Sequence, residues 1–257
     1  MTTKVYLSPS SQEDNKYSYG NWTEAQVCRK IAEYTKTALE RNGFRVKLAK
    51  EGLNIQQRIA ESNDWGADVH QPIHTNAGGG DGTLVMCYTG CKNNKYVKNV
   101  YESVATLTPT KDDGIRVNTS LAEITGTTAM CVYVEVEFHD NSTTAKWIVN
   151  HMREIGESIA KGYCKAEGKS YKSGSNSSGG TTAEVGNLWR VQVGAYRDSK
   201  NASAQGERLS KRGFESYIYF DAGVYKVQAG AFTKKESAEK RAEELKKAGF
   251  NVYVYKK

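Results

Sequence analysis

One histidine and two glutamates, each at the end of a separate element, could form a hydrolytic zinc site. His74 closes a short apolar-leaning run and is followed at once by Thr-Asn-Ala-Gly-Gly-Gly. Glu135 lies in a second run, residues 131–138, which breaks at His-Asp-Asn. Glu24 opens a helical pattern that follows the strand-like residues 4–7. In such a site two residues bind the metal ion and the third acts as a base.

These segments also follow one another in a known order. Thr23-Glu24 begins the first helix, Ile-His-Thr-Asn-Ala at residues 73–77 ends one strand, and Val-Glu-Val-Glu-Phe at residues 134–138 ends another. Residues from Lys4 to about Cys164 therefore resemble the zinc-dependent N-acetylmuramoyl-L-alanine amidases of bacterial cell-wall lysis, the amidase-3 type.

The resemblance implies hydrolysis of the amide that joins N-acetylmuramic acid to L-alanine, with Zn²⁺ as cofactor. His74 and Glu24 match two of the family's metal ligands, and Glu135 matches its general base or transition-state stabiliser. The family's first ligand is a histidine in the loop after the first strand, where this chain has Ser11 and no histidine before His70. We expect Asp14 to replace it, since a carboxylate oxygen binds zinc at ~2.0–2.2 Å; Glu13 is a weaker candidate.

Other polar residues near these motifs are expected to support the site or to lie elsewhere. His139 and Asn76 follow the two strand ends, so we expect them next to the metal ligands. His70 lies on the same strand face as His74 but about 13 Å away, too far to share an ion. His70 is expected to be a core or channel residue, and His151 to lie on the surface.

The composition limits the partners. The chain has 257 residues and a net charge of +7, a pI near 9.0 and a mean hydropathy of −0.65. Its basic residues are spread along helical patterns, which argues against nucleic acid, and no apolar run approaches a membrane span of ~18 residues. Peptidoglycan is the expected partner, with teichoic acid phosphate as a second anionic candidate.

The cysteines do not suggest a second metal site. Cys28 falls in a helical pattern and Cys131 in a strand, which is typical of small buried thiols. Cys87 and Cys91 lack the second pair that a structural zinc knuckle requires. The N-terminus shows no secretory signal, so we expect synthesis in the cytoplasm and release to the wall by another route.

The remaining pattern predicts an α/β catalytic domain over residues 1–167. Helical segments (23–42, 55–62, 96–107 and 144–164) alternate with strand-like segments (4–7, 44–48, 68–74, 83–88 and 132–138). This alternation predicts a mixed or mostly parallel sheet flanked by helices. Ligand sites in such sheets lie beyond the carboxyl ends of the strands, where His74 and Glu135 are expected.

A Gly/Ser-rich stretch at residues 168–187 predicts a linker, and residues 188–257 contain an internal repeat. Arg-Val-Gln-Val-Gly-Ala-Tyr at residues 190–196 returns as Lys-Val-Gln-Ala-Gly-Ala-Phe at 226–232, and Tyr-Ile-Tyr at 217–219 returns as Tyr-Val-Tyr at 253–255. Each unit predicts strand, helix and strand, so two units make a small α+β domain of βαββαβ order with one four-stranded sheet.

The repeat resembles the sporulation-related repeat (SPOR) domain, whose members bind peptidoglycan. We expect Gln192 and Gln228 on the sheet face opposite the strand valines, with Tyr196 and Phe232 at the strand ends. Amides meet sugar hydroxyls and aromatic rings stack on sugars, so these four residues are the expected substrate-binding set.

Together these patterns predict a peptidoglycan amidase anchored to the wall by a second domain, either a phage endolysin released by a holin or a sporulation autolysin released by lysis. The alternative is a catalytically inactive wall-binding protein, which the missing loop histidine motivates.

Overall fold

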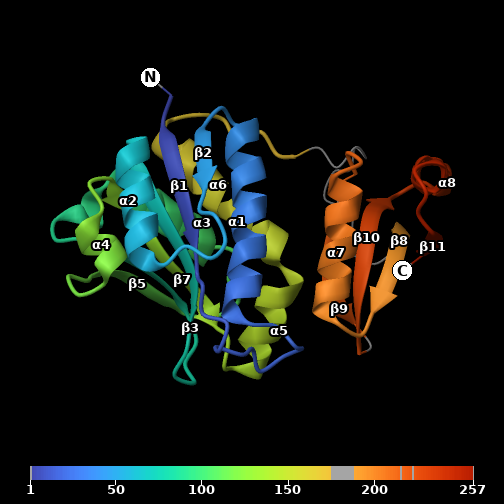
Figure 1. The fold of residues 1–257 in the computed structure, drawn as a ribbon, viewed down its shortest axis with the longest axis horizontal. Coiled ribbons are helices and arrows are strands. Elements are labelled where there is room, and N and C mark those ends of the chain that lie inside the picture. The colour runs from blue at the N-terminus through green and yellow to red at the C-terminus, as the bar shows by residue number, and fades with distance from the viewer. Residues whose placement is uncertain (1, 175–187, 215, 222, 257) are drawn as a thin grey trace. The chain divides into compact units, whose positions relative to one another are not determined.

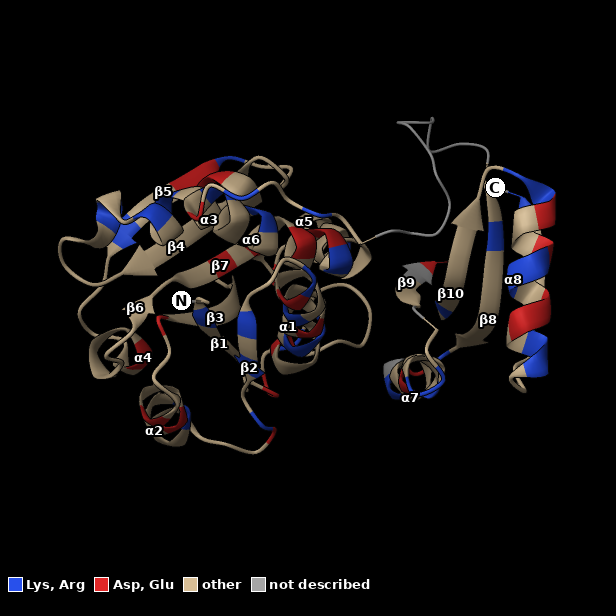
Figure 2. Cartoon of the chain, turned by 90° about the horizontal axis from the view of Figure 1, so that it is seen from above, with Lys and Arg blue, Asp and Glu red and all other residues tan. Residues whose placement is uncertain are grey.

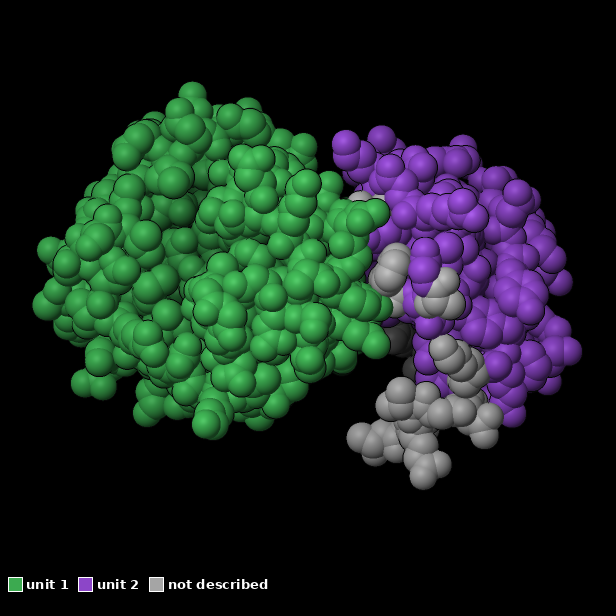
Figure 3. All heavy atoms as spheres, turned by 90° about the horizontal axis from the view of Figure 1, so that it is seen from below, with its two compact units in different colours: residues 1–173 green, residues 174–257 purple. Residues whose placement is uncertain are grey.

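The computed structural model describes residues 2–174, 188–214, 216–221 and 223–256. Its contacts divide the chain into two compact units, residues 1–173 and 174–257 (Figure 3). Most of the expected linker, residues 175–187, lies outside the described part. The described beginning of that stretch belongs to the first unit, because Tyr171 donates to Glu157 and the Lys172 amide donates to Asn42 at 2.6 Å. None of the described helices has the length and apolar character needed to cross a bilayer.

The first unit is a mixed sheet covered by helices on both faces, as the sequence predicts (Figure 1). Its described strands follow the order β2-β1-β3-β7-β4-β5, with β6 paired to β3. Neighbours β2, β1, β3 and β7 are parallel, whereas β4 runs antiparallel to β7 and parallel to β5. The strands are β1 (Lys4–Pro9), β2 (Arg45–Leu48), β3 (Val69–Asn76), β4 (Thr83–Cys87), β5 (Asp112–Val117), β6 (Met130–Cys131) and β7 (Tyr133–Phe138).

The helices form two layers. On one side α1 (Glu24–Arg41), α3 (Lys95–Ala105) and α6 (Met152–Ala166) pack together, and on the other α2 (Ile55–Trp65) contacts the short α4 (Ala122–Gly126) (Figure 2). A short 3-10 turn, Cys91–Asn93, precedes α3. Within β3 the alternation of side chains separates the layers: His70 meets Ser62 of α2, whereas Gln71 accepts a hydrogen bond from Tyr163 of α6.

Helix α1 begins and ends where its sequence predicts. Thr23 caps it, with its side chain accepting from the Gln26 amide at 3.3 Å and the Gln26 side chain accepting from the Thr23 amide. This reciprocal pair satisfies two donors that a helix N-terminus leaves free. At the other end Asn42 caps the helix and Gly43 takes a φ of 79°. The cap therefore fixes Glu24, the next residue, at the first turn.

The single helix expected over residues 144–164 is wrong, because the structure has two. α5 (Ser142–Asn150) ends at His151, whose ψ of 20° interrupts the chain before α6. The His151 ring stacks on Trp147 at 4.5 Å and its Nδ1 lies 2.7 Å from the Trp147 carbonyl oxygen. His151 is thus half-buried at the junction between two helices rather than on the open surface.

The second unit has the predicted βαββαβ order. Its elements are β8 (Trp189–Tyr196), α7 (Ser199–Ser210), β9 (Tyr217–Asp221), β10 (Val224–Phe232), α8 (Lys235–Lys247) and β11 (Tyr253–Lys256). Its described strands make one antiparallel sheet in the order β11-β8-β10-β9. Both helices contact β8 and β10, so they cover one face of this sheet and leave the other open.

Candidate active site and wall-binding face

The structure brings Glu24, His74 and Glu135 together at one end of the first sheet. His74 on β3 is the direct register partner of Glu135 on β7. Glu24, at the start of α1, places Oε1 2.8 Å from Nδ1 of His74. Side chains from three elements therefore meet at the carboxyl ends of parallel strands, the expected place for a site in such a sheet.

Burial and charge set the protonation of these groups. Burial raises the pKa of Glu135 to about 7. The charge of His74 opposes this increase, and the Glu24 carboxylate adds a smaller one. Burial alone would lower the pKa of His74, but its hydrogen bond to Glu24 and the charge of Glu135 raise it. Burial would likewise raise the pKa of Glu24, whose hydrogen bonds from His74, Asn15 and Ser10 lower it instead. Two carboxylates in one site thus have pKa values pushed apart, the arrangement that acid–base catalysis uses.

Glu135 also has an unsatisfied oxygen. Its Oε2 is buried and has no hydrogen-bond partner within the described residues. A buried polar atom without a partner is costly, and such atoms concentrate where a ligand or substrate completes the site.

The loop between β1 and α1 surrounds Glu24 with neutral polar groups. Nδ2 of Asn15 donates to Oε2 of Glu24 at 2.7 Å, and the Ser10 hydroxyl hydrogen-bonds the same carboxylate. Asp14, the expected third ligand, and Glu13 and Ser11 are exposed. Glu13 instead accepts from Thr23 at 2.9 Å. The loop residues that reach Glu24 are therefore Ser10 and Asn15, the latter one position after Asp14. Sequence reasoning missed them because no periodicity distinguishes positions in a loop.

The site's chemistry suits a metal ion with two of the expected ligands. His74 Nδ1 and Glu24 Oε1 converge on one point, and an imidazole nitrogen and a carboxylate oxygen are both zinc ligands. No cluster of three or more His, Cys, Asp or Glu suited to a metal occurs in the described part of the chain. Asn15 and Ser10, which hydrogen-bond Glu24, are neutral oxygen-bearing side chains beside this pair.

Aromatic and hydroxyl groups hold the histidine strand in place. Tyr133 stacks on His74 with ring centroids 4.7 Å apart. His139, which the sequence places beside the site, is buried, stacks on Tyr17 at 5.4 Å and lies 3.1 Å from Thr75 Oγ1. Thr75 also accepts from the Tyr17 hydroxyl at 3.0 Å. These contacts fix the backbone on either side of His74.

Asn76 turns away from the ligands. Its Oδ1 accepts from the next backbone amide, Ala77, at 2.9 Å, and its carbonyl accepts from the His139 amide at 2.9 Å. Its contacts are to the turn that follows β3.

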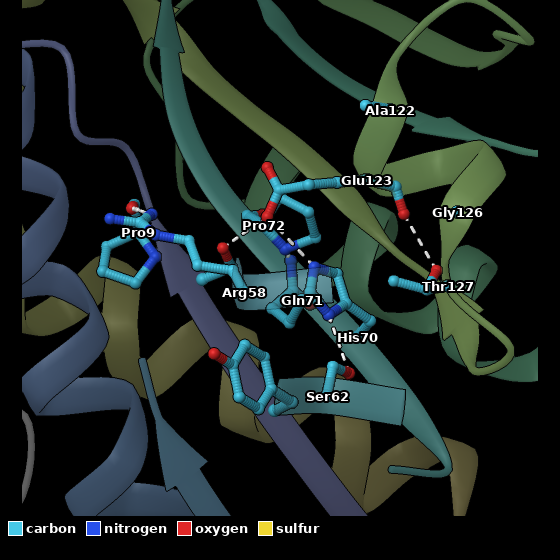
Figure 4. Close-up of polar contacts among 12 residues, drawn as sticks. Pro9, Arg58, Ser62, His70, Gln71, Pro72, Ala122, Glu123, Gly126 and Thr127 are labelled. Atoms are coloured by element: carbon cyan, nitrogen blue, oxygen red, sulfur yellow. Dashed lines mark hydrogen bonds and ion pairs between the residues drawn. The ribbon is translucent and has the colours of Figure 1, made fainter. Parts of the chain in front are cut away.

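A second buried polar cluster lies deeper on the same face of β3 (Figure 4). His70 places Nδ1 2.9 Å from Ser62 and Nε2 3.0 Å from Glu123 of α4. Glu123 also accepts from Ser8, and Arg58 donates to the Pro9 carbonyl. His70 is a core residue, as predicted, and the cluster joins α2 and α4 to the end of β1 just before the Ser10 loop.

The cysteines are partly as expected. Cys28 and Cys131 are buried free thiols, and burial raises the pKa of both. Cys87 and Cys91 form a disulfide, with Cα atoms 6.1 Å apart. This bond was not predicted from the sequence, where the pair was weighed only as metal ligands.

The open face of the second sheet carries amides and tyrosines. Register pairs Gln192 with Tyr253, Arg190 with Tyr255, and Gln228 with Tyr217, so these residues share a face. Arg190 donates to Gln228 Oε1 at 3.0 Å. Tyr219 of β9 and Tyr255 of β11, on opposite edges of the sheet, join their hydroxyls at 2.8 Å. Tyr253 is 64% exposed.

The expected open-face position of Phe232 is wrong. Register shifts on either side of Gln228 bring Phe232 opposite Trp189, and Phe232 is only 6% exposed. Its ring fills the space beside Gly230, where a Cβ would approach it to 2.5 Å. Tyr196 repeats the arrangement over Gly194, also at 2.5 Å. The two rings belong to the packing at the bulges, and strict alternation along the strands could not show this.

Comparisons with known proteins agree with both units. Residues 9–165 match the family described as N-acetylmuramoyl-L-alanine amidase, and residues 186–256 match the SPOR domain. The chain is 28% identical over 226 residues to the N-acetylmuramoyl-L-alanine amidase CwlM of Bacillus licheniformis, covering 84% of this chain and 85% of that protein. It is 27% identical over 224 residues to the sporulation-specific N-acetylmuramoyl-L-alanine amidase of Bacillus subtilis, covering 84% of each.

Solved structures show the same fold. The catalytic domain of the amidase CwlV from Bacillus (Paenibacillus) polymyxa var. colistinus matches with a TM-score of 0.59 at 20% identity, covering 66% of this chain and 100% of that one. The catalytic domain of the CD27L endolysin, which targets Clostridia difficile, matches with a TM-score of 0.53 at 19% identity, covering 67% and 99%. The chain belongs to the N-acetylmuramoyl-L-alanine amidase family and is a peptidoglycan amidase with a SPOR domain in its second unit.

Proposed function

We propose that the chain hydrolyses the amide between N-acetylmuramic acid and L-alanine with the help of zinc, at the site formed by Glu24, His74 and Glu135. The observation that carries the proposal is the buried, unpartnered Oε2 of Glu135 directly across from His74. His74 also meets Glu24, so a base of raised pKa stands beside a pair of metal-ligand groups.

His74 and Glu24 would hold the ion. When bound, zinc supplies Lewis acidity, which polarises a substrate carbonyl and acidifies a water. Asn15 is our candidate for the place of the missing loop histidine, since its amide already reaches Glu24 and rotation of that amide would present its oxygen instead. This replaces the expectation for Asp14.

Glu135 would move the protons of the reaction. With a pKa of about 7 it is partly ionised near neutral pH, and its free Oε2 accepts a proton from the attacking water. The hydroxyl oxygen bonds to the lactyl carbonyl carbon, the carbon–nitrogen bond breaks, and Glu135 returns the proton to the amine of L-alanine. One carboxylate thus serves as base and then as acid.

The second unit would bind the wall through its open face. Gln192 keeps its predicted role there. Gln228 shares that face but is only 8% exposed and accepts from Arg190, so it would support the face rather than contact a sugar. The tyrosines Tyr217, Tyr219, Tyr253 and Tyr255 take the place of Tyr196 and Phe232 as rings that stack on sugars. Residues 188–257 contain 15 Lys and Arg and 8 Asp and Glu, so their net charge is +7, the same as that of the whole chain. This excess charge favours an anionic wall polymer such as teichoic acid as a second contact.

Zinc dependence is tested by metal content and reconstitution. Protein purified without added metal should contain about one zinc per chain, lose amidase activity on chelation and regain it when zinc returns. Full activity in metal-free protein would contradict the proposal. Zinc-loaded protein that binds walls but releases no L-alanine amino groups would support the inactive wall-binding alternative.

A further inference from the structure

Glu137 has a strained backbone next to the site. Between the pairs His74–Glu135 and Asn76–Phe138, β7 contains one more residue than β3, which makes a bulge. Glu137 lies in this bulge with a φ of 55°. Among the described residues other than glycine, it is the one whose φ is positive. Residues with a Cβ avoid this region, and such strain tends to be kept where the surrounding structure needs it.

The Glu137 carboxylate joins two segments that meet at this end of the sheet. It is 0% exposed. Its Oε2 accepts from the Gly82 amide at 3.0 Å, and the Thr110 hydroxyl lies 2.8 Å from both of its oxygens. Gly82 leads into β4, and Thr110 lies between α3 and β5. A buried carboxylate is tolerated when it is hydrogen-bonded, so these contacts hold both segments to β7.

The residues that follow Glu137 contact the rest of the same turn. The Phe138 ring lies against Gly80, where an added Cβ would approach it to 2.8 Å. Asp140 Oδ2 accepts from the amides of Gly78 and Gly79 at 2.6 and 2.9 Å. Asn141 donates to the Gly80 carbonyl at 3.2 Å.

This turn, residues 77–82, directly follows the strand that carries His74. Figure 1 shows the connection from β3 to β4 projecting from the end of the sheet at which the site lies. Its first residues, Ala77, Gly78 and Gly79, are exposed and have little or no side chain. Such a surface lets a bulky polymer approach the backbone closely.

We propose that the turn 77–82 is a fixed wall of the substrate groove that seats polymeric peptidoglycan against Glu135, and that Glu137 is the positioning residue that sets it. The inference rests on the proposed amidase function. The wall is pre-organised, because the β7 bulge turns the Glu137 carboxylate onto the turn while Glu135 stays in register with His74. Glu137 therefore governs how well the polymer is held, and Glu135 governs the proton transfer.

The test compares Glu137→Gly with Glu137→Gln in the full chain. Glycine accepts the φ of 55° but removes the anchor, whereas glutamine keeps the length and one acceptor oxygen for Gly82. Asp64→Asn is the control, since Asp64 is an exposed acidic residue of α2, outside the turn. Amide exchange across residues 78–82, KM and kcat on purified peptidoglycan, and the pH profile are measured for each.

We expect Glu137→Gly to speed amide exchange in the turn by about tenfold or more, because the opening of a loop depends on its anchoring bonds. KM for the polymer should rise by about tenfold with kcat and the pH profile nearly unchanged, and Glu137→Gln should recover most of the loss. Unchanged exchange and KM in a folded Glu137→Gly variant would overturn the proposal, as would loss of bound zinc together with kcat.

A second variant tests the same proposal if Glu137→Gly does not fold. Asp140 is exposed, and Asp140→Asn weakens the anchor at Gly78 and Gly79 without opening the core. This variant should also raise amide exchange across residues 78–82 and KM for purified peptidoglycan. Unchanged values would count against the proposal that the turn is a wall of the substrate groove. If the wild-type protein releases no L-alanine amino groups, the proposed function fails, while the exchange rates still decide whether Glu137 fixes the turn.

Discussion

His74 and Glu135 are direct register partners on the parallel strands β3 and β7, and one oxygen of Glu135 has no partner in the described structure. Parallel neighbours place the side chains of paired residues on the same face of the sheet. The histidine therefore offers a nitrogen to Glu24 while the carboxylate opposite remains available to a substrate. This division of roles leads to the following predictions.

The metal-free protein should be more stable when Glu135 is replaced by glutamine. Its pKa is raised to about 7, so the protonated form is favoured in the folded state. The contribution of protonated Glu135 to the free energy of unfolding is therefore fully present below its unfolded pKa near 4.5. It is lost as the pH rises through about 7. At pH 8 Glu135→Gln should recover about 3 kcal/mol in the free energy of unfolding. Denaturant unfolding of chelated protein at pH 4 and pH 8 checks this, and equal stability of both proteins at pH 8 would be inconsistent with a buried, unpartnered carboxylate.

Asn15 and Asp14 should differ in their effect on zinc. Asn15→Ala removes the amide that reaches Glu24 and should weaken zinc binding by about tenfold or more, whereas Asp14→Ala should leave it nearly unchanged. Competition with a chromophoric chelator measures both variants. Loss of zinc from Asp14→Ala but not from Asn15→Ala would show that Asp14 is the third ligand, as the sequence suggested.

The buried cluster around His70 should matter for stability and less for chemistry. Glu123→Ala leaves Ser8 and His70 without their shared acceptor and should cost about 3 kcal/mol. Burial would raise the pKa of Glu123, but hydrogen bonds from His70 and Ser8 lower it below its ordinary value. Its stabilising contribution is therefore present above about pH 4.5 and disappears as pH falls through the lowered pKa. Thermal unfolding from pH 3 to pH 7 measures this. The difference in stability between the wild type and Glu123→Gln should become smaller as the pH falls.

Wall binding should depend on the open face of the second sheet. Combined Gln192→Ala and Tyr253→Ala should weaken sedimentation of the full chain with purified walls by about tenfold, because stacking and amide contacts are lost. Lys240→Ala is the control, since Lys240 is an exposed residue of α8, one of the helices that cover the other face of the sheet. Equal weakening by the control and steep loss of binding with salt would show that charge, rather than the open face, makes the contact.

Sequence reasoning was most accurate where local chemistry determines structure. The Thr23 cap, the Gly43 end of α1 and the end of β7 at Phe138 all follow from neighbouring residue types, and β3 ends at Asn76, two residues past the expected His74. Because strands that end together gather their last residues at one edge, Glu24, His74 and Glu135 could be placed together before the structure was known.

The misses arise where tertiary contacts decide the outcome. Asn15 rather than Asp14 reaches Glu24 because the loop is folded by bonds between distant residues, such as the Glu24 amide to the Asn15 carbonyl at 2.8 Å. Helical periodicity continues through His151, so the break between α5 and α6 left no signal. The bulge at Glu137 and the register shifts around Gln228 break the strict alternation of side chains along their strands, and only the register shows them.

The central claim is that Glu135 drives cleavage of the amide between N-acetylmuramic acid and L-alanine, and product analysis of digested peptidoglycan tests it most directly. The zinc-loaded wild-type chain should release free amino groups of L-alanine without new reducing sugar ends. Glu135→Gln should keep its zinc and lower the rate by about 10²–10⁴. New reducing ends without new amino termini would indicate a glycosidase and contradict the account. A Glu135→Gln variant with the wild-type rate would remove Glu135 from the mechanism.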